Sequence, residues 1–387
     1  MPASDVVVIG AGAIGAAVAW RCARRGRSVT VVDPDLSRGA WHTAAGMLAP
    51  ATELHTTEQP LLHLGLESLA RWPQFAAELT RESGVDLGYR ETGTVLVAWD
   101  AADLATLRIL HTLAESLGVE ASLLTGRELR ELEPALAAGI PGAYHAPGDH
   151  QVDPRRLHEA LLVACRRRGV TFVESPGAVL TDRDQVRGVR VAGGEVLRST
   201  RVVVAAGAWS GQVEGVPEAA RVPVRPVKGQ TLRLRLRGRP RLTRVVRGNV
   251  QGSPVYIVPR SDGSYVVGAS SEEAGFDTAP RAGAVYELLR DAQALFPELG
   301  EATLEQVCTG LRPGSPDNAP VIGPSQVEGL VWATGHHRNG ILLTPVTADA
   351  VASLLVDLTF DEALHPFLPQ RLEVGSAIGP GIGSGTA

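Results

Sequence analysis

The segment from Val6 to Asp33, VVVIGAGAIGAAVAWRCARRGRSVTVVD, decides the fold class of this chain. It reads as a short apolar strand, a glycine-rich turn, a helix of small residues and a second apolar strand. In the turn, Gly10, Gly12 and Gly15 form the pattern GxGxxG. These glycines allow a tight turn, a close approach of the backbone to a pyrophosphate, and close packing of the helix on the strand.

The chemistry of this unit suits a dinucleotide. The helix after the turn would present free amide N–H groups and the positive end of its dipole to the pyrophosphate. Asp33 ends the second strand, where its carboxylate can accept hydrogen bonds from an adenosine ribose. The segment therefore predicts a dinucleotide-binding domain, but it does not separate FAD from NAD.

Composition narrows the class of protein. The chain has 387 residues, which is long enough for two domains, and a formal net charge of -5. General attraction to nucleic acid or to anionic membranes requires excess positive charge, so neither is expected as a partner. Cys22, Cys165 and Cys308 lie far apart without a CxxC pair. They predict neither a disulfide framework nor a zinc site, and no metal is expected.

The two ends of the sequence carry no targeting signal that we recognise. The first residues lack the basic start, apolar run and cleavage site of a signal peptide, and no run of about 18 apolar residues could span a membrane. We therefore expect a cytoplasmic protein. Residues 372–387 are rich in Gly and Ser and nearly uncharged, so we expect them to form a disordered tail.

Two later segments resemble strands of the first domain. RVVVAAGAWS (Arg201–Ser210) and GLVWATGHHRNG (Gly329–Gly340) each carry an apolar strand into a glycine turn. Their positions indicate that one domain is assembled from separated pieces of chain. That arrangement is typical of large flavoproteins and favours FAD over NAD.

A second domain is predicted from the intervening residues, which read as a mostly antiparallel sheet with flanking helices. The expected strands are 93–98, 222–236, 242–247, 255–259 and 265–268, and the expected flanking helices are 102–117 and 281–295. Helical patterns at 60–82 and 154–168 are expected to be ordinary scaffold. Residues 221–260 contain eleven Lys or Arg and no Asp or Glu. In TLRLRLRGRPRL (231–242) arginine alternates with leucine at period two, which favours a strand with one buried and one solvated face, although polyanion binding stays an alternative.

Five stretches together resemble the D-amino-acid-oxidase-like flavoproteins, and within them the glycine oxidases of thiamine biosynthesis. They are Val6–Asp33, AAGMLAP (Ala44–Pro50), YIVPRSDGSYVVGAS (Tyr256–Ser270), GLRPGSPDNAPVIG (Gly310–Gly323) and GHHRNGILLTP (Gly335–Pro345). The likeness runs from about residue 4 to residue 366.

The resemblance implies an α/β fold with an FAD-binding Rossmann-like domain of the glutathione-reductase type and a second α+β substrate domain. The implied FAD-binding ranges are 1–82, 147–218 and 311–366, and the implied substrate-domain ranges are 83–146 and 219–310. It also implies that the turn 336–340 lies along the pyrimidine edge of the flavin. The helix after this turn would point its N-terminus at that edge, where reduction places negative charge.

The resemblance implies a specific set of site residues. At the cofactor it places Gly10, Gly12, Ala13, Ile14, Gly15, Asp33, Ala44, Ala45, Gly46, Met47, Val173, Ala206, Gly207, Trp209, His336, His337, Arg338, Asn339, Gly340 and Ile341. For catalysis it implies Arg312, Tyr256 and Arg338, with Arg312 and the Tyr256 hydroxyl holding a substrate carboxylate. A structural salt bridge is the alternative role for Arg312.

The expected reaction is FAD-dependent oxidation of glycine, or of sarcosine or a small D-amino acid, by molecular oxygen. The products would be an imine or 2-oxo acid, ammonia and hydrogen peroxide, with no protein base required, and the imine could supply a thiazole synthase of the thiamine pathway. Two alternatives stay open. One is a dehydrogenase of the same fold with another electron acceptor, and the other is a tRNA-modifying flavoprotein that uses the Arg-rich strand. We also expect a homo-oligomer.

Some positions depart from the family pattern. Pro254 stands where glycine oxidases can carry His, Ser271 where a bulky Met can stand, and His337 where an aromatic residue is usual. The small Ser271 would leave room for a substrate larger than glycine. Related sarcosine oxidases bind flavin through a cysteine, but our alignment puts that cysteine at Gly310. We therefore expect noncovalent FAD and a small buried side chain at Cys308.

Overall fold

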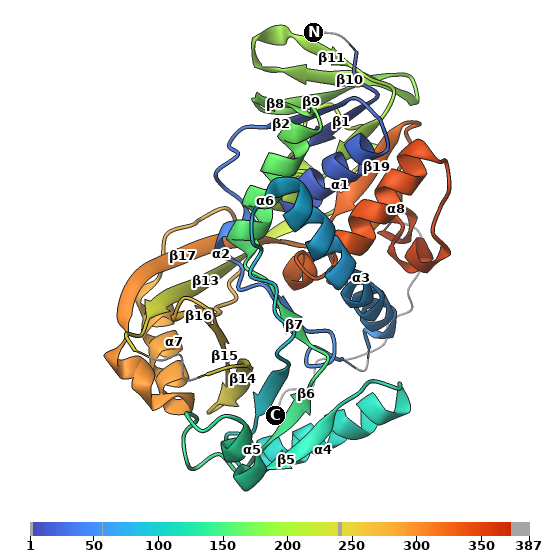
Figure 1. Ribbon diagram of the computed structural model, residues 1–387. Helices are drawn as coiled ribbons and strands as arrows, with labels where there is room; N and C mark the ends of the chain where they lie inside the picture. The colour runs from blue at the N-terminus through green and yellow to red at the C-terminus, as the bar shows by residue number, and fades with distance from the viewer. Residues whose placement is uncertain (1–2, 56, 239–241, 373–387) are drawn as a thin grey trace.

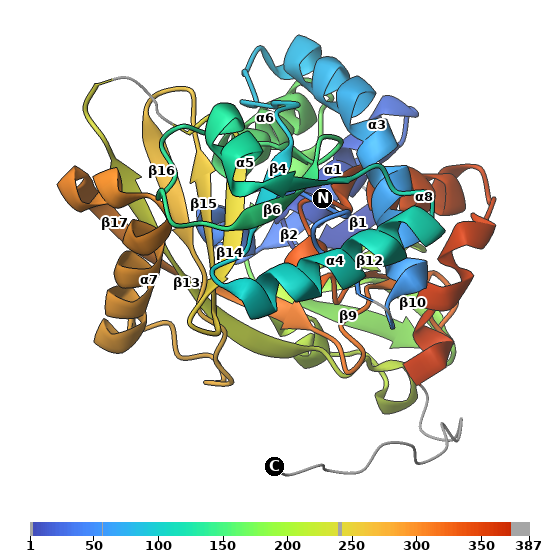
Figure 2. The ribbon, with the colours of Figure 1, turned by 90° about the horizontal axis from the view of Figure 1, so that it is seen from below.

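The computed structural model describes residues 3–55, 57–238 and 242–372. A six-stranded sheet and its helices form the upper part of the molecule in Figure 1, and an eight-stranded sheet forms the lower part (Figures 1 and 2). The predicted tail, apart from Leu372, lies outside the described residues. Among the described residues, no helix is long and apolar enough to cross a bilayer.

The six-stranded sheet contains the glycine motif. Its strands are, in spatial order, β18 (Val321–Pro324), β19 (Leu330–Thr334), β12 (Val202–Val204), β1 (Val6–Ile9), β2 (Val29–Asp33) and β8 (Thr171–Glu174). All neighbours are parallel except β18 and β19. Side chains alternate between faces, so Val6 and Val8 pack under helices whereas Val7 and Ile9 pack against a three-stranded sheet. That smaller sheet comprises β9 (Gly177–Asp182), β10 (Gln185–Val191) and β11 (Val196–Arg198).

The eight-stranded sheet is antiparallel except where β14 pairs with β4. Its strands are, in spatial order, β17 (Thr303–Gly314), β13 (Arg225–Arg235), β16 (Ser264–Gly268), β15 (Ser253–Pro259), β14 (Val245–Val250), β4 (Thr94–Val97), β6 (Gly142–Ala146) and β5 (Ser122–Thr125). A short pair, β3 (Met47–Leu48) and β7 (His150–Gln151), lies apart from both large sheets. Strands of the two large sheets follow the expected domain ranges, except that β17 continues to Gly314, past the expected boundary at 310.

The helices pack on the sheets and complete two hydrophobic cores. They are α1 (Ala13–Arg24), α2 (Ala40–Thr43), α3 (Gln59–Ser83), α4 (Ala101–Ser116), α5 (Gly126–Leu132), α6 (Pro154–Arg167), α7 (Ala282–Leu295) and α8 (Thr344–Val356). Helices α1, α3, α6 and α8 share one core with the six-stranded sheet, and α7 packs under the eight-stranded sheet. The expected helices therefore match α3, α4, α6 and α7 to within about two residues at each end.

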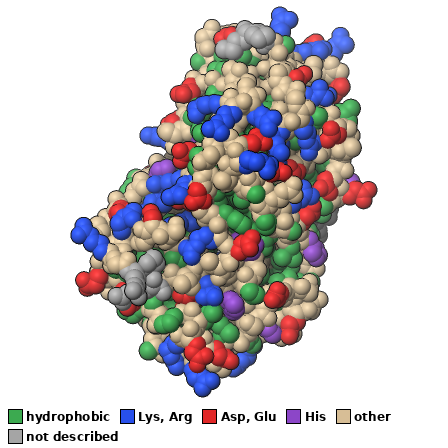
Figure 3. Space-filling view, in the orientation of Figure 1, with side chains coloured by type: hydrophobic (Ala, Val, Ile, Leu, Met, Phe, Trp, Pro, Cys, Tyr) green, Lys and Arg blue, Asp and Glu red, His purple; other side chains and the backbone are tan. Residues whose placement is uncertain are grey.

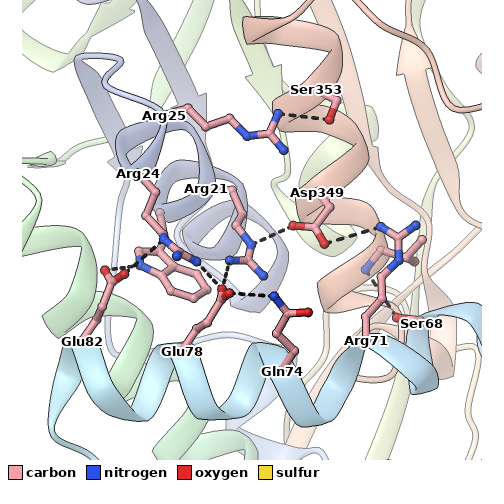
Figure 4. A network of polar contacts seen from close by, with 12 residues as sticks. Arg21, Arg24, Arg25, Ser68, Arg71, Gln74, Glu78, Glu82, Asp349 and Ser353 are labelled. Carbon is pink, nitrogen blue, oxygen red and sulfur yellow. Dashed lines mark hydrogen bonds and ion pairs between the residues drawn. The ribbon is translucent and has the colours of Figure 1, made fainter.

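A polar network fixes α1 between α3 and α8 (Figure 4). Arg21 and Arg24 of α1 both donate to Glu78 of α3, and the Arg21 Nε lies 2.7 Å from Asp349 Oδ1 of α8. Burial alone would raise the pKa of Glu78, but hydrogen bonds from Arg21, Gln74 and Arg24 lower it to about 2. The network borders a polar hollow of about 510 Å³ and holds the helix that follows the glycine motif.

Candidate cofactor and substrate cleft

A cleft of about 650 Å³ lies between the two large sheets, a volume in the usual range of ligand sites. One wall comes from the six-stranded sheet and its loops, within 9–14, 32–53, 205–209 and 333–341. The other wall is one face of the eight-stranded sheet, from β4, β13, β14, β15 and β17 and the residues after β16. Four chain segments that are distant in sequence thus build the first wall of one continuous site, and strands of the eight-stranded sheet build the second wall.

The glycine motif forms one end of the cleft. Gly10 has φ +108°, and a methyl group added there would lie 2.6 Å from the Ala205 carbonyl carbon, so this turn needs glycine. A methyl group at Gly15 would lie 3.2 Å from the Ala205 Cβ, as expected for close packing of helix on strand. At Gly12 it would meet no protein atom within 4 Å and would project into open space.

These residues fit a dinucleotide. No side chain caps the N-terminus of α1, so its first amides are free for a ligand. Two buried polar atoms of cleft-lining residues, Trp41 Nε1 and Thr43 Oγ1, have no hydrogen-bond partner in the described part of the chain. Buried polar atoms are normally satisfied, so a polar ligand is the missing partner that they indicate.

Asp33 lies at the expected place, at the end of β2 and on the cleft wall. Its Oδ2 accepts a hydrogen bond from Ala11 N at 2.7 Å and its Oδ1 accepts one from Asp35 N at 2.9 Å. Burial raises the pKa of this carboxyl, and the two amides oppose that shift. Each oxygen keeps a further lone pair, so the carboxylate can still accept from a ribose while it braces the glycine turn.

The turn between β19 and α8 carries free amides toward the cleft. The backbone N–H groups of Gly340, Ile341 and Leu342 have no acceptor among the residues that the structure describes. Gly340 and Ile341 line the cleft, and α8 itself begins later than expected, at Thr344. The anion-favouring amides therefore belong to the turn that precedes the helix, where three consecutive N–H groups can face a negatively charged ligand edge.

The two histidines of this turn behave differently. His336 is buried, and its Nε2 lies 3.0 Å from the Thr347 hydroxyl of α8, so its side chain fastens the turn to the helix. His337 has φ +46° and lines the cleft with its neighbours. Burial, followed by the charges of Arg312 and Arg338, lowers the pKa of His337 to about 4. Both imidazoles are therefore neutral near pH 7.

Arg312 provides the positive charge on the opposite wall. It lies near the end of β17, and its Nη1 donates two long hydrogen bonds, to Ser270 O at 3.2 Å and to Lys228 O at 3.4 Å. No carboxylate pairs with this guanidinium within the described ranges, so the alternative of a structural salt bridge is not observed. A half-buried arginine without a counter-ion in a cleft is a site for an anion.

Tyr256 of β15 lines the same wall. Burial raises the pKa of its hydroxyl, and the charges of Arg312 and Arg247 oppose that shift, so the group is a protonated donor near pH 7. Its hydroxyl makes no hydrogen bond to any described residue. The site therefore has two free donors of the kind that a carboxylate requires.

Glu53 is a cleft residue that sequence reasoning missed. Its Oε1 lies 3.1 Å from Arg247 Nη1, and its Oε2 lies 3.2 Å from Arg338 Nε. The contact between Oε2 and Arg338 is an ion pair whose geometry does not make a hydrogen bond. Oε2 is therefore a buried acceptor with no hydrogen-bond donor in the described chain. The cleft therefore contains a carboxylate that lies outside the quoted motifs, and Arg338 is paired with Glu53 and, at 3.8 Å, with Glu58.

Most expected site residues do line the cleft. They are Arg312, Tyr256, Arg338, Gly10, Gly12, Ala13, Ile14, Asp33, Ala44, Ala45, Gly46, Met47, Ala206, Gly207, Trp209, His336, His337, Asn339, Gly340 and Ile341. Gly15 and Val173 are not among the lining residues; Gly15 acts in packing, and Val173 lies on β8, paired with Val32. Pro254 and Ser271, the departures from the family pattern, line the cleft. Cys308 is 3 % exposed in β17, as expected for a small buried side chain.

Acidic groups from elsewhere in the chain pair with five of the basic side chains in the described part of the Arg-rich stretch and reduce its positive charge. The ion pairs are Arg225–Glu273, Lys228–Asp277, Arg235–Glu305, Arg244–Glu133 and Arg247–Glu53. Blue and red side chains are mixed over the face seen in Figure 3. The expected solvated face was wrong at Arg233, whose Nε and Nη2 are buried without a partner in the described chain. Along the described residues of the stretch, these pairs interrupt the positive charge that a polyanion would need.

Comparisons with known proteins identify the family of this chain. Residues 5–354 match the DAO family model, described as FAD dependent oxidoreductase. A bifunctional protein ThiO/ThiG of Trichormus variabilis is 33% identical over 379 residues, covering 97% of this chain and 56% of the relative. The chain thus spans about half the length of such two-function relatives.

Two further relatives match over nearly their whole length. The hydrogen cyanide synthase subunit HcnC of Pseudomonas aeruginosa is 30% identical over 95% of this chain and 96% of its own. The crystal structure of glycine oxidase from Geobacillus kaustophilus superposes with a TM-score of 0.88 at 33% identity, covering 96% of this chain and 99% of that chain.

Proposed function

The chain belongs to the DAO family of FAD-dependent oxidoreductases, and from that membership we propose that it oxidises a small amino acid, with glycine as the preferred substrate. The observation that carries the proposal is the unpaired Arg312 beside the free hydroxyl of Tyr256. Among the described residues, the guanidinium has no carboxylate partner and the hydroxyl has no acceptor; on the wall opposite the proposed cofactor-binding turns, this pair suits the carboxylate of such a substrate.

The cofactor would be held by the residues that form the other wall. The free amides of Gly12 and Ala13 suit its pyrophosphate, Asp33 suits its ribose, and the amides of Gly340 and Ile341 suit an electron-rich edge. FAD bound there supplies a two-electron acceptor for the hydride leaving the substrate Cα.

The protein side chains bind the substrate and orient it. Arg312 and Tyr256 hold the carboxylate, which fixes the amine and Cα relative to the rest of the cleft. Glu53 provides an acceptor for an amine N–H, because Oε2 has no hydrogen-bond donor of its own in the described chain. Arg247 and Arg338 lie on either side of this carboxylate, with Nη1 and Nε at 3.1 and 3.2 Å from its two oxygens, and so fix its position in the cleft.

The overall reaction that we propose converts glycine, oxygen and water to glyoxylate, ammonia and hydrogen peroxide. Relatives named glycine oxidase and ThiO/ThiG support glycine as substrate and a thiazole synthase as the user of the intermediate imine. The ion pairs of the Arg-rich stretch count against the tRNA alternative.

The test is anaerobic mixing of the purified yellow protein with glycine, sarcosine and D-alanine in turn, followed by admission of air. We expect glycine to bleach the visible flavin band and air to restore it with release of peroxide. Bleaching without reoxidation by air would favour the dehydrogenase alternative. If all three compounds leave the band unchanged, the small-amino-acid proposal is wrong.

A further inference from the structure

Two glycines lie beneath the pair of side chains that we assign to the substrate carboxylate. The four relevant strands are neighbours in the order β17, β13, β16 and β15. Arg312 belongs to the outer strand β17 and Tyr256 to the outer strand β15, whereas the two strands between them carry Gly229 and Gly268. The side chains that must converge therefore come from strands that do not touch each other.

Each outer side chain occupies the space that a Cβ would need on the neighbouring inner strand. A methyl group at Gly229 would lie 2.5 Å from Nη2 and 2.6 Å from Cζ of Arg312. A methyl group at Gly268, which is the register partner of Tyr256, would lie 2.7 Å from Cε2 of that tyrosine. Contacts this short are not tolerated, so neither side chain could keep its position over an alanine.

Other glycines of this sheet have different neighbours. Gly310 is the register partner of Gly229, but its added methyl would lie 2.9 Å from Thr43 Cβ on the other wall. At Gly248 the nearest atom is Val97 Cγ2 at 2.9 Å, so this glycine makes room for an apolar side chain of neighbouring β4 and not for Arg312 or Tyr256. The association of glycine with the carboxylate-binding side chains is therefore particular to Gly229 and Gly268.

We propose that Gly229 and Gly268 are positioning residues for the substrate carboxylate, because their missing side chains leave the space above β13 and β16 in which Arg312 and Tyr256 approach each other. This inference rests on the proposed function, since it presumes that Arg312 binds a carboxylate. Gly229 acts through Arg312 and Gly268 acts through Tyr256; neither touches the reacting atoms. Strand glycine that weakens a sheet is commonly retained where another group must come close.

Gly229→Ala is the decisive variant because the displaced atoms are the far end of a flexible side chain. The guanidinium can swing away without a change of backbone, so we expect normal FAD content and an unchanged melting temperature. Binding of acetate, a carboxylate that cannot react, is measured by its perturbation of the flavin spectrum. We expect its Kd to rise roughly tenfold or more, and KM for glycine to rise by more than kcat falls.

A double-mutant cycle separates positioning from general damage. If Gly229 acts through Arg312, Gly229→Ala has no further effect on acetate binding in an Arg312→Ala background. Gly268→Ala is the parallel variant, with its effect expected to vanish in a Tyr256→Ala background. Unchanged acetate binding by Gly229→Ala, or an equal loss in both backgrounds, overturns the inference and leaves the proposed function standing. Failure of the unmodified protein to bind acetate or any small amino acid overturns both.

Discussion

Replacing Arg312 by alanine removes the one cleft guanidinium that, among the described residues, has no acidic partner. Its protein contacts are two long hydrogen bonds to neutral carbonyls, at 3.2 and 3.4 Å, so their loss should change folding stability by about 1 kcal/mol or less. The loss of binding free energy for a substrate carboxylate should be far larger than this change in folding stability. A half-buried charge pair with two parallel hydrogen bonds is expected to contribute about 3–5 kcal/mol, or roughly 10²–10⁴-fold in binding.

The assay is the rate of anaerobic flavin bleaching as a function of substrate concentration, for glycine and for methylamine, which lacks the carboxylate. We expect Arg312→Ala to lose most of its kcat/KM for glycine and to keep its low activity with methylamine, because the lost interaction is with the carboxylate. Arg225→Ala is the matched control. It removes an arginine from the end of neighbouring β13, where a half-exposed ion pair with Glu273 contributes little.

Two results would refute this reasoning. Glycine turnover by Arg312→Ala comparable to that of the unmodified protein would mean that the carboxylate binds elsewhere. An equal loss with glycine and methylamine would mean that the substitution damages the cleft in general and says nothing of carboxylate recognition.

Three further substitutions probe the other parts of the structure. Tyr256→Phe removes a hydroxyl without a partner in the described chain, so the melting temperature should not change. In steady-state assays, the fall in kcat/KM for glycine should correspond to a loss of about 1–3 kcal/mol in transition-state binding. Gly12→Ala places a methyl group where no protein atom lies within 4 Å; the apoprotein should melt normally, and FAD titration should show a loss of about tenfold or more in affinity. Glu78→Gln removes a carboxylate whose pKa falls from 4.5 to about 2 on folding, which should cost about 1–2 kcal/mol at pH 7 after solvent screening is allowed for. Because a lowered pKa stabilises above the unfolded value, the difference in melting temperature between Glu78→Gln and the unmodified protein should shrink as the pH falls below 4.5; a constant difference would contradict this account.

Local sequence patterns predicted the helices and strands well because those elements depend on the spacing of neighbouring residues. The glycine motif marked β1 and α1, and the alternation of arginine and leucine marked β13, which is Arg225–Arg235. Periodicity could not tell where the arginines of that strand would point. Arg235 reaches Glu305 near the surface, whereas Nε and Nη2 of Arg233 are buried without a partner in the described chain.

The charged residues of the site were less predictable because they come from separate segments and form no motif with a fixed spacing. Glu53, Arg247 and Arg338 meet only when β14 and the turn before α8 approach the loop after β3. Arg338 belongs to a quoted motif, but Glu53 and Arg247 are unremarkable in their own segments, so no window of sequence contains the triad. Likewise, His336 sits in a motif that suggests a ligand, yet its imidazole is hydrogen-bonded to Thr347 inside the protein.

The order of strands in the six-stranded sheet affects how the protein can be made. Strand β1 cannot pair with β12 until Val202–Val204 have been synthesised, and β12 cannot pair with β19 until Leu330–Thr334 have been synthesised. The free amides of Gly340 and Ile341 emerge later still. A nascent chain therefore carries an unpaired sheet edge through most of its synthesis, which exposes it to aggregation. The complete cofactor cleft forms only after synthesis has passed residue 341, so the full FAD site requires every one of these separated segments.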